Sequence, residues 1–113
     1  MLLSAVSALV LMMQGGTVAD VITDYSNCLV EVTNADLDKE LSGVDHAKAL
    51  QDSCPDEKQA YWDSTVRDEM GFGSSRAEAE QFATDEVAAM IETYNAQYGD
   101  LKSRNVRLVK KGD

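Results

Sequence analysis

Apolar side chains recur at three- and four-residue steps along most of this chain, and that period constrains its fold more than any other feature. The longest series lies between residues 79 and 98, a span of about five helical turns. Its members are Ala79, Phe82, Ala83, Val87, Met90, Ile91, Tyr94 and Tyr98. Such a period places them on one face of an amphipathic helix, which must be buried against another element. The sequence therefore predicts an all-α protein.

The same pattern predicts three to four helices within one domain, residues 20–100. Their expected spans are 20–34, 46–53, 55–70 and 76–99. Asp45 is expected to cap the second helix, and Pro55 suits the first position of the third. Ser75 and Glu78 match the reciprocal capping box at the start of the fourth. Because the links are short and each apolar face needs a partner, we expect a small antiparallel bundle.

An apolar leader precedes this domain. Residues 1–19 contain no Asp, Glu, Lys or Arg, and the run 2–13 has the length of a signal-peptide core. Thr17-Val18-Ala19 predicts cleavage before Asp20, although the basic residue that normally opens a signal peptide does not precede the run. An ordinary buried helix and an uncleaved membrane anchor are the alternatives. The sequence thus predicts a periplasmic or secreted protein that contacts the membrane only through its leader before cleavage.

The two cysteines agree with export. An even number of cysteines in a short exported chain indicates a disulfide, and Cys28 and Cys54 have neither a CxxC spacing nor a nearby histidine at metal-ligand spacing. We therefore expect a Cys28–Cys54 disulfide that links the first helix to the start of the third.

Charge divides the chain into an acidic body and a basic tail. The net charge is −10; residues 20–100 carry nineteen acidic and five basic side chains, whereas residues 101–113 carry one acidic and five basic ones. We expect this basic tail, residues 101–113, to be flexible or loosely docked. The acidic body disfavours nucleic acid and suits a cationic protein partner, or simply solubility.

No motif in the sequence indicates catalysis or a cofactor. His46 is the only histidine and is predicted at the surface or its boundary, so a catalytic triad is not expected. Asp36, Asp38 and Glu40 begin like a calcium loop, but Leu41 and Ala47 stand where that loop needs glycine and glutamate. We expect no metal site, no cofactor and no enzyme.

Aromatic residues are the remaining candidates for a binding surface. Tyr61 and Trp62 are adjacent, so they point about 100° apart on a helix and one of them should lie at the rim of the core. These two residues form the predicted partner surface.

The segment Cys54-Pro55-Asp56-Glu57-Lys58-Gln59-Ala60-Tyr61-Trp62 resembles the region after the second cysteine of periplasmic acid-stress chaperones of the HdeA type. The resemblance covers about nine residues and implies a small exported helical chaperone that loosens at low pH. The sequence as a whole predicts a non-enzymatic exported protein that acts by protein–protein interaction, with a stress or chaperone-like role as one form of it. The alternatives are an acidic inhibitor of a cationic enzyme and a small hydrolase.

Overall fold

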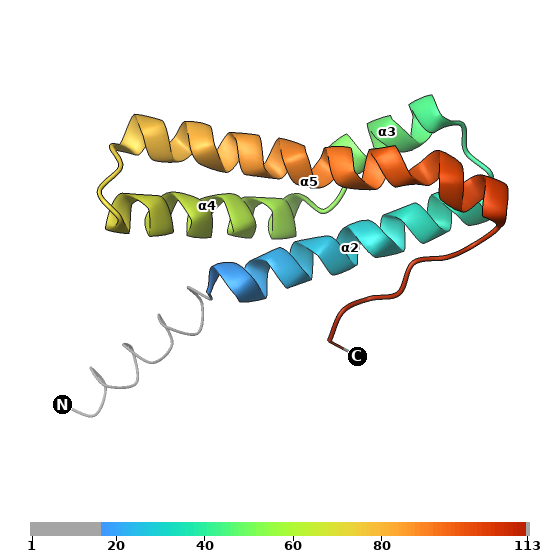
Figure 1. The fold of residues 1–113 in the computed structure, drawn as a ribbon, viewed down its shortest axis with the longest axis horizontal. Helices are drawn as coiled ribbons and strands as arrows, with labels where there is room; N and C mark the ends of the chain where they lie inside the picture. The colour runs from blue at the N-terminus through green and yellow to red at the C-terminus, as the bar shows by residue number, and fades with distance from the viewer. Residues whose placement is uncertain (1–16, 113) are drawn as a thin grey trace.

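The computed structural model describes residues 17–112, which form four helices and a C-terminal segment (Figure 1). The helices are α2 (Val18–Asp38), α3 (Gly43–Asp52), α4 (Pro55–Gly71) and α5 (Arg76–Arg104), and the described residues contain no strand. The predicted all-α class is confirmed. The signal-peptide prediction lies outside the described residues except for Thr17-Val18-Ala19, where α2 begins.

The longest helix, α5, organises the bundle. Helix α4 runs antiparallel beside the first part of α5, and α3 lies beside its second part (Figure 1). Helix α2 contacts the other three helices along the remaining side. None of the four described helices is long and apolar enough to cross a membrane.

Three of the helix starts follow from capping side chains. Ser75 accepts a hydrogen bond from the Glu78 backbone N–H while the Glu78 carboxylate accepts one from the Ser75 N–H, so the predicted capping box is confirmed. Thr17 caps α2 in the simpler one-sided manner. The prediction that Asp45 caps the second helix is wrong, because Ser42 accepts from the Asp45 N–H at 3.1 Å and the helix begins at Gly43.

The fourth start belongs to proline. Pro55 takes the first position of α4, as predicted, directly after Cys54. Its fixed φ suits a helix and its missing N–H costs nothing there, since the first turn has no acceptor for it. This residue therefore sets the boundary between α3 and α4.

Two helices extend further than their sequence pattern predicts. Helix α2 continues to Asp38 and α5 to Arg104, whereas the expected ends were near residues 34 and 99. Leu37 of α2 and Leu101 of α5 are both buried and pack together with Tyr98. This contact between residues far apart in the chain stabilises the last turns of both helices. Asn34 and Gly99 therefore do not end them.

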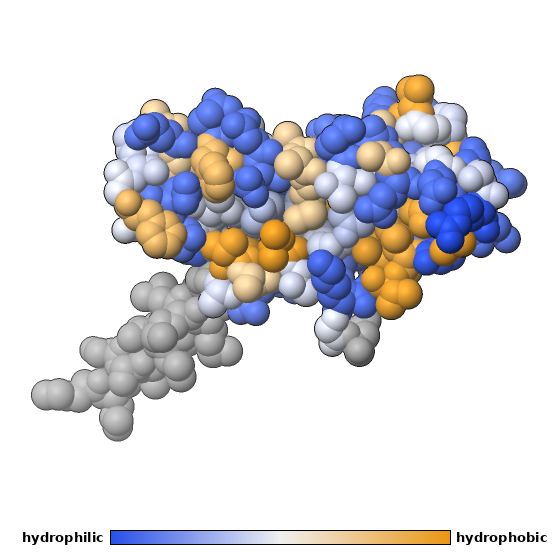
Figure 2. Space-filling view, viewed as in Figure 1, coloured by the Kyte–Doolittle hydropathy of each residue, from blue (hydrophilic) through white to orange (hydrophobic). Residues whose placement is uncertain are grey.

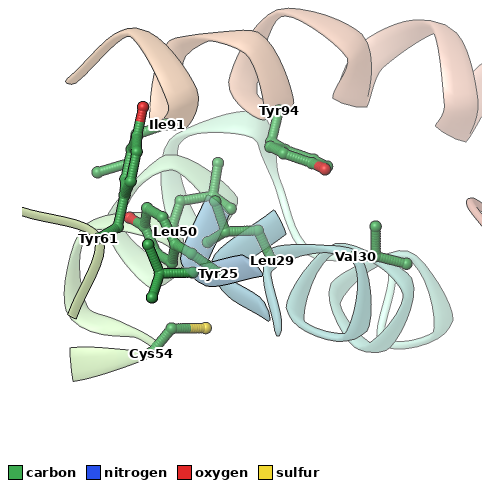
Figure 3. Packing of buried hydrophobic residues seen from close by; sticks show 9 residues of the cluster. Tyr25, Leu29, Val30, Leu50, Cys54, Tyr61, Ile91 and Tyr94 are labelled. Atoms are coloured by element: carbon green, nitrogen blue, oxygen red, sulfur yellow. The ribbon is translucent and has the colours of Figure 1, made fainter. Parts of the chain in front are cut away.

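The main core lies where α2, α3, α4 and α5 meet. Tyr25, Leu29 and Leu50 have no exposed surface and converge with side chains from the other two helices (Figure 3). A smaller cluster at the α4–α5 seam contains Val66, Ala79 and Ala83. Phe82, predicted on the inner face, is instead 43% exposed, because it lies about 100° around the helix from Ala83 and the seam follows the small alanines.

Candidate functional site

The predicted disulfide is present and joins α2 to the start of α4. Cys28 and Cys54 are bonded, with their Cα atoms 6.2 Å apart, and no cysteine of the chain is free. Such a bridge is compatible with an oxidising, exported location. Cys54 is buried in the main core and Cys28 packs against that core, so the disulfide is also part of the core packing.

The predicted partner surface is divided between core and rim. Tyr61 is buried beside the ring of Tyr25, with ring centroids 6.1 Å apart, and its hydroxyl donates to Glu86. Burial, and then the charge of Glu86, raises the pKa of Tyr61. Trp62 is half-buried, and its indole N–H donates to the Thr84 hydroxyl at 3.1 Å. Only Trp62 therefore presents a face to a partner, over a shallow pocket of about 220 Å³.

His46 does not lie at the surface, as the sequence predicted, but at the centre of a buried cluster. It has no exposed surface and stacks on Tyr98 with ring centroids 3.8 Å apart. Its Nδ1 lies 2.8 Å from Asp36 Oδ2. The Tyr98 hydroxyl donates to the backbone carbonyls of Asp36 and Leu41. Burial, followed by the Asp36 charge, raises the pKa of Tyr98.

This cluster holds three helices together. It ties the end of α2 to α3 and α5, and the extension of α2 beyond residue 34 is what brings Asp36 to the imidazole. Among the described residues, no group of three His, Cys, Asp or Glu side chains is placed to hold a metal ion. Asp36 and Asp38 belong to a helix and not to a calcium loop.

A second polar arrangement lies on the outer face of α2. Asn27, Glu31, Asn34 and Asp38 follow one another at helical spacing and so form one line, here called the polar stripe. Every member of the stripe contacts the C-terminal segment, residues 105–112, which turns back after α5 and runs beside α2 (Figure 1).

The two asparagines bind the backbone of that segment. The Asn34 side chain accepts from the Leu108 N–H at 2.9 Å and donates to the Leu108 carbonyl at 3.0 Å. Asn27 makes the same pair of bonds with Lys111, at 2.8 and 3.0 Å. Seven residues of helix separate the two asparagines by about 10 Å, a distance that three residues span only when nearly extended. The stripe thus holds an extended backbone, antiparallel to α2.

The two carboxylates of the stripe bind the basic side chains of the same segment. Asp38 pairs with Arg107 at 2.9 Å, and Glu31 pairs with Lys110. Between them, Leu108 packs against both core clusters that border α2 and α5. Val109, in contrast, is 84% exposed. Leu108 therefore faces the protein, and its neighbour Val109 faces the solvent.

A partly filled groove lies under the segment. It has a volume of about 350 Å³, and its walls come from Ile22, Ser26 and Val30 of α2 and Met90 and Tyr94 of α5. Leu108, Val109 and Lys111 of the segment border it. Ser26 and Tyr94 are hydrogen-bonded to each other through their hydroxyls. Figure 2 shows apolar side chains gathered at two places on the lower edge of this face, one of them below the C-terminal half of α5.

No family model, curated protein or solved structure matches the chain.

The helical spacing of the polar stripe is present in the sequence, but the expected end of the first helix near residue 34 left Asp38 outside that helix. With the first helix expected to end near residue 34, Asn27 and Glu31 counted as ordinary outward-facing residues. The sequence also predicted a flexible or loosely docked tail from residue 101. In the structure, residues 101–104 belong to α5, and residues 107–111 lie against α2 with four amide hydrogen bonds and two ion pairs. Extending the helix by one turn would have aligned Asn34 and Asp38 with the other two.

Proposed function

We propose that this chain is a non-enzymatic, exported protein, periplasmic or secreted, that acts by binding another protein through the acidic and amide face of α2. One observation supports this most strongly: the polar stripe already holds a basic polypeptide segment, through both its backbone and its charges. The disulfide and the apolar leader support export.

The charge distribution supports a cationic partner. Residues 20–100 carry fourteen more acidic than basic side chains, so a basic protein is attracted over a long range at low salt. Bonds to a backbone need no particular sequence and therefore suit a segment of another protein. An inhibitor of a cationic enzyme would use the same face.

Affinity capture tests the proposal. The disulfide-intact protein is immobilised and exposed to an envelope extract at low salt and at about 0.5 M salt, where the screening length falls to a few ångströms. We expect a protein that is captured at low salt, lost at high salt, and lost in the charge-reversed variant Glu31→Lys/Asp38→Lys. Capture that persists both at high salt and in the charge-reversed variant, or no capture at all, would contradict the proposal.

A chaperone-like stress function is the second candidate, supported by the local resemblance around Cys54 and by the nineteen body carboxylates. Protonating these carboxylates turns the net charge from negative to positive and removes the ion pairs of α2. An aggregation-suppression assay at pH 2–3 and at pH 7 separates the two candidates. Suppression only at the acidic pH would favour the chaperone, and its absence would leave the interaction protein.

A further inference from the structure

The groove between α2 and α5 is bordered by an extended segment of the same chain, which the polar stripe holds through the segment's backbone and charges. We propose that this groove binds in trans a partner segment with the pattern Arg-apolar-x-Lys, and that residues 107–111 occupy it as an intramolecular competitor. The proposal rests on the proposed function and specifies its partner and its regulation.

The backbone contacts define the conformation of the ligand. Asn27 and Asn34 each engage both the N–H and the carbonyl of one residue, three positions apart in the segment. Any residue except proline offers this pair of groups. Only an extended chain presents two of them at the spacing of two helical turns. The asparagines therefore select extended polypeptide, whatever its sequence.

The side-chain contacts define the sequence of the ligand. Asp38 favours a cation one residue before the apolar anchor, and Glu31 favours another two residues after it, as Arg107 and Lys110 show. The anchor, Leu108, packs against the residues that border the groove. The residue between anchor and second cation is solvent-exposed, as Val109 is, and is free to vary.

The contacts of the present occupant are of the exchangeable kind. Both ion pairs are at the surface, with 37–69% of their side chains exposed, so each contributes little to binding in water. The segment is attached through Asn105, whose φ of 54° lies in the left-handed region. A change of conformation at this one residue redirects the whole segment, at the cost of the hydrogen bond from the Val106 N–H to the Leu101 carbonyl at the end of α5.

Charge favours a basic partner over a second copy of this chain. Two molecules with a net charge of −10 repel each other, whereas the groove attracts a segment rich in Arg and Lys. The intramolecular segment therefore raises the concentration at which a partner segment can bind. A tethered competitor acts at an effective concentration on the order of millimolar, so a free peptide must compete with it.

Fluorescence anisotropy with a labelled synthetic peptide of residues 105–113 (NVRLVKKGD) tests the proposal. The titrated proteins are the wild type and the variant Arg107→Glu/Lys110→Glu, in which the tail is repelled by the stripe and the groove is freed. We expect the freed variant to bind the peptide about tenfold more tightly than the wild type, because the tethered competitor is gone.

Two matched variants of the freed protein locate the site. Asn34→Leu removes the two hydrogen bonds to the backbone at the anchor position and should weaken binding at least tenfold. The control Gln81→Leu removes an exposed amide that hydrogen-bonds within α5, and it should leave binding unchanged. A peptide with Leu108→Asp tests the anchor without altering the protein, and it should bind at least tenfold more weakly. Circular dichroism confirms that each variant is folded.

Equal binding to the wild type and the freed variant, or full binding to folded Asn34→Leu, would overturn the proposal. Concentration-dependent dimerisation of the wild type that the peptide reverses would make a second copy the occupant and would overturn the assignment to a partner. The two proposals fail separately. A salt-sensitive capture without peptide binding would leave the proposed function and remove this site, and peptide binding without capture would do the opposite.

Discussion

Several buried side chains of this small protein carry polar atoms, and their partners decide what each contributes. The Tyr98 hydroxyl donates to two backbone carbonyls, and Tyr94 is bonded to Ser26. The hydroxyl of Tyr25 has no hydrogen-bond partner among the described residues, although its ring is fully buried. Paired groups stabilise the fold, whereas an unpaired one in the core costs free energy because it has lost its water.

Tyr25 should therefore control stability at alkaline pH. Burial, and then the proximity of Tyr61, raises the pKa of Tyr25 to about 12 from 10.0. The unfolded chain then releases this proton at lower pH than the native state, so the free energy of unfolding should fall as pH rises from about 10 to 12, by about 2–3 kcal/mol.

The variant Tyr25→Phe removes both the unpaired hydroxyl and this titration. We expect its stability at pH 7 to equal or exceed that of the wild type, and its loss between pH 10 and 12 to be smaller. Urea denaturation at pH 7, 10 and 11 measures both effects. An identical alkaline loss in the two proteins would show that Tyr25 is not the group responsible.

His46 should be essential to stability despite having no expected catalytic role. His46→Ala leaves a cavity beside Tyr98 and deprives the buried Asp36 carboxylate of its partner, and we expect a loss of about 3 kcal/mol in the free energy of unfolding. Chemical denaturation measures it, with the exposed Lys48→Ala on the same helix as the control. If both variants lose equally little, the cluster does not stabilise the fold.

At the scale of elements, contacts at the helix termini determine much of where each helix lies in the sequence. Thr17, Ser42 and Ser75 each cap a helix through a side-chain oxygen, and Asn105 ends α5 in the left-handed conformation. These contacts are local in sequence. The three capping side chains can therefore fix where α2, α3 and α5 begin without a tertiary contact.

The capping box of α5 offers the clearest test of an element. We expect Ser75→Ala to lower the free energy of unfolding by about 1 kcal/mol at pH 7, because the first turn loses an acceptor. Hydrogen bonds from Ser75 lower the pKa of Glu78, so its contribution is present above the ordinary glutamate pKa and is lost as pH falls through the lowered value.

Thermal melts from neutral to strongly acidic pH measure this difference. The effect of Ser75→Ala should shrink as the pH falls through the lowered pKa of Glu78, because a protonated carboxyl no longer favours the box. Ser103→Ala, near the other end of the same helix, serves as the control and should change stability little. A loss at Ser103 equal to that at Ser75 would rule out a capping effect.

At the scale of the whole molecule, the disulfide and the C-terminal segment complete a core that is small. The bridge closes a loop across a separation of 26 residues, and the segment covers the α2–α5 groove. A domain of this size buries limited apolar surface, so a cross-link accounts for a large share of its stability.

Reduction should therefore destabilise the protein strongly. We expect dithiothreitol to lower the free energy of unfolding by roughly 3.5 kcal/mol, by the entropy of a loop of this size, and to lower the melting temperature by many degrees. Calorimetry with and without reductant measures the change. The variant Cys28→Ser/Cys54→Ser should melt low in both conditions, and an oxidised protein whose melt ignores the reductant would contradict the disulfide's stabilising role.

The sequence by itself determined the local structure of this protein. Helical period predicted the all-α class, Pro55 and the Ser75–Glu78 box marked two helix starts, and cysteine number predicted the disulfide. All of these depend on residues close in the chain, or on counts. The helix starts can be predicted from the sequence because their physical cause lies within a few residues of its effect. The disulfide can be predicted because the chain has only two cysteines to pair.

Tertiary structure alone decided the rest. Leu37 with Leu101 and Asp36 with His46 meet only after the bundle has formed, and these contacts extend two helices and bury a histidine that the sequence placed at the surface. The polar stripe gains meaning in the same way, since its partners lie more than sixty residues along the chain. Periodicity shows which side of a helix is apolar, but packing decides where the helix ends and what its polar side holds.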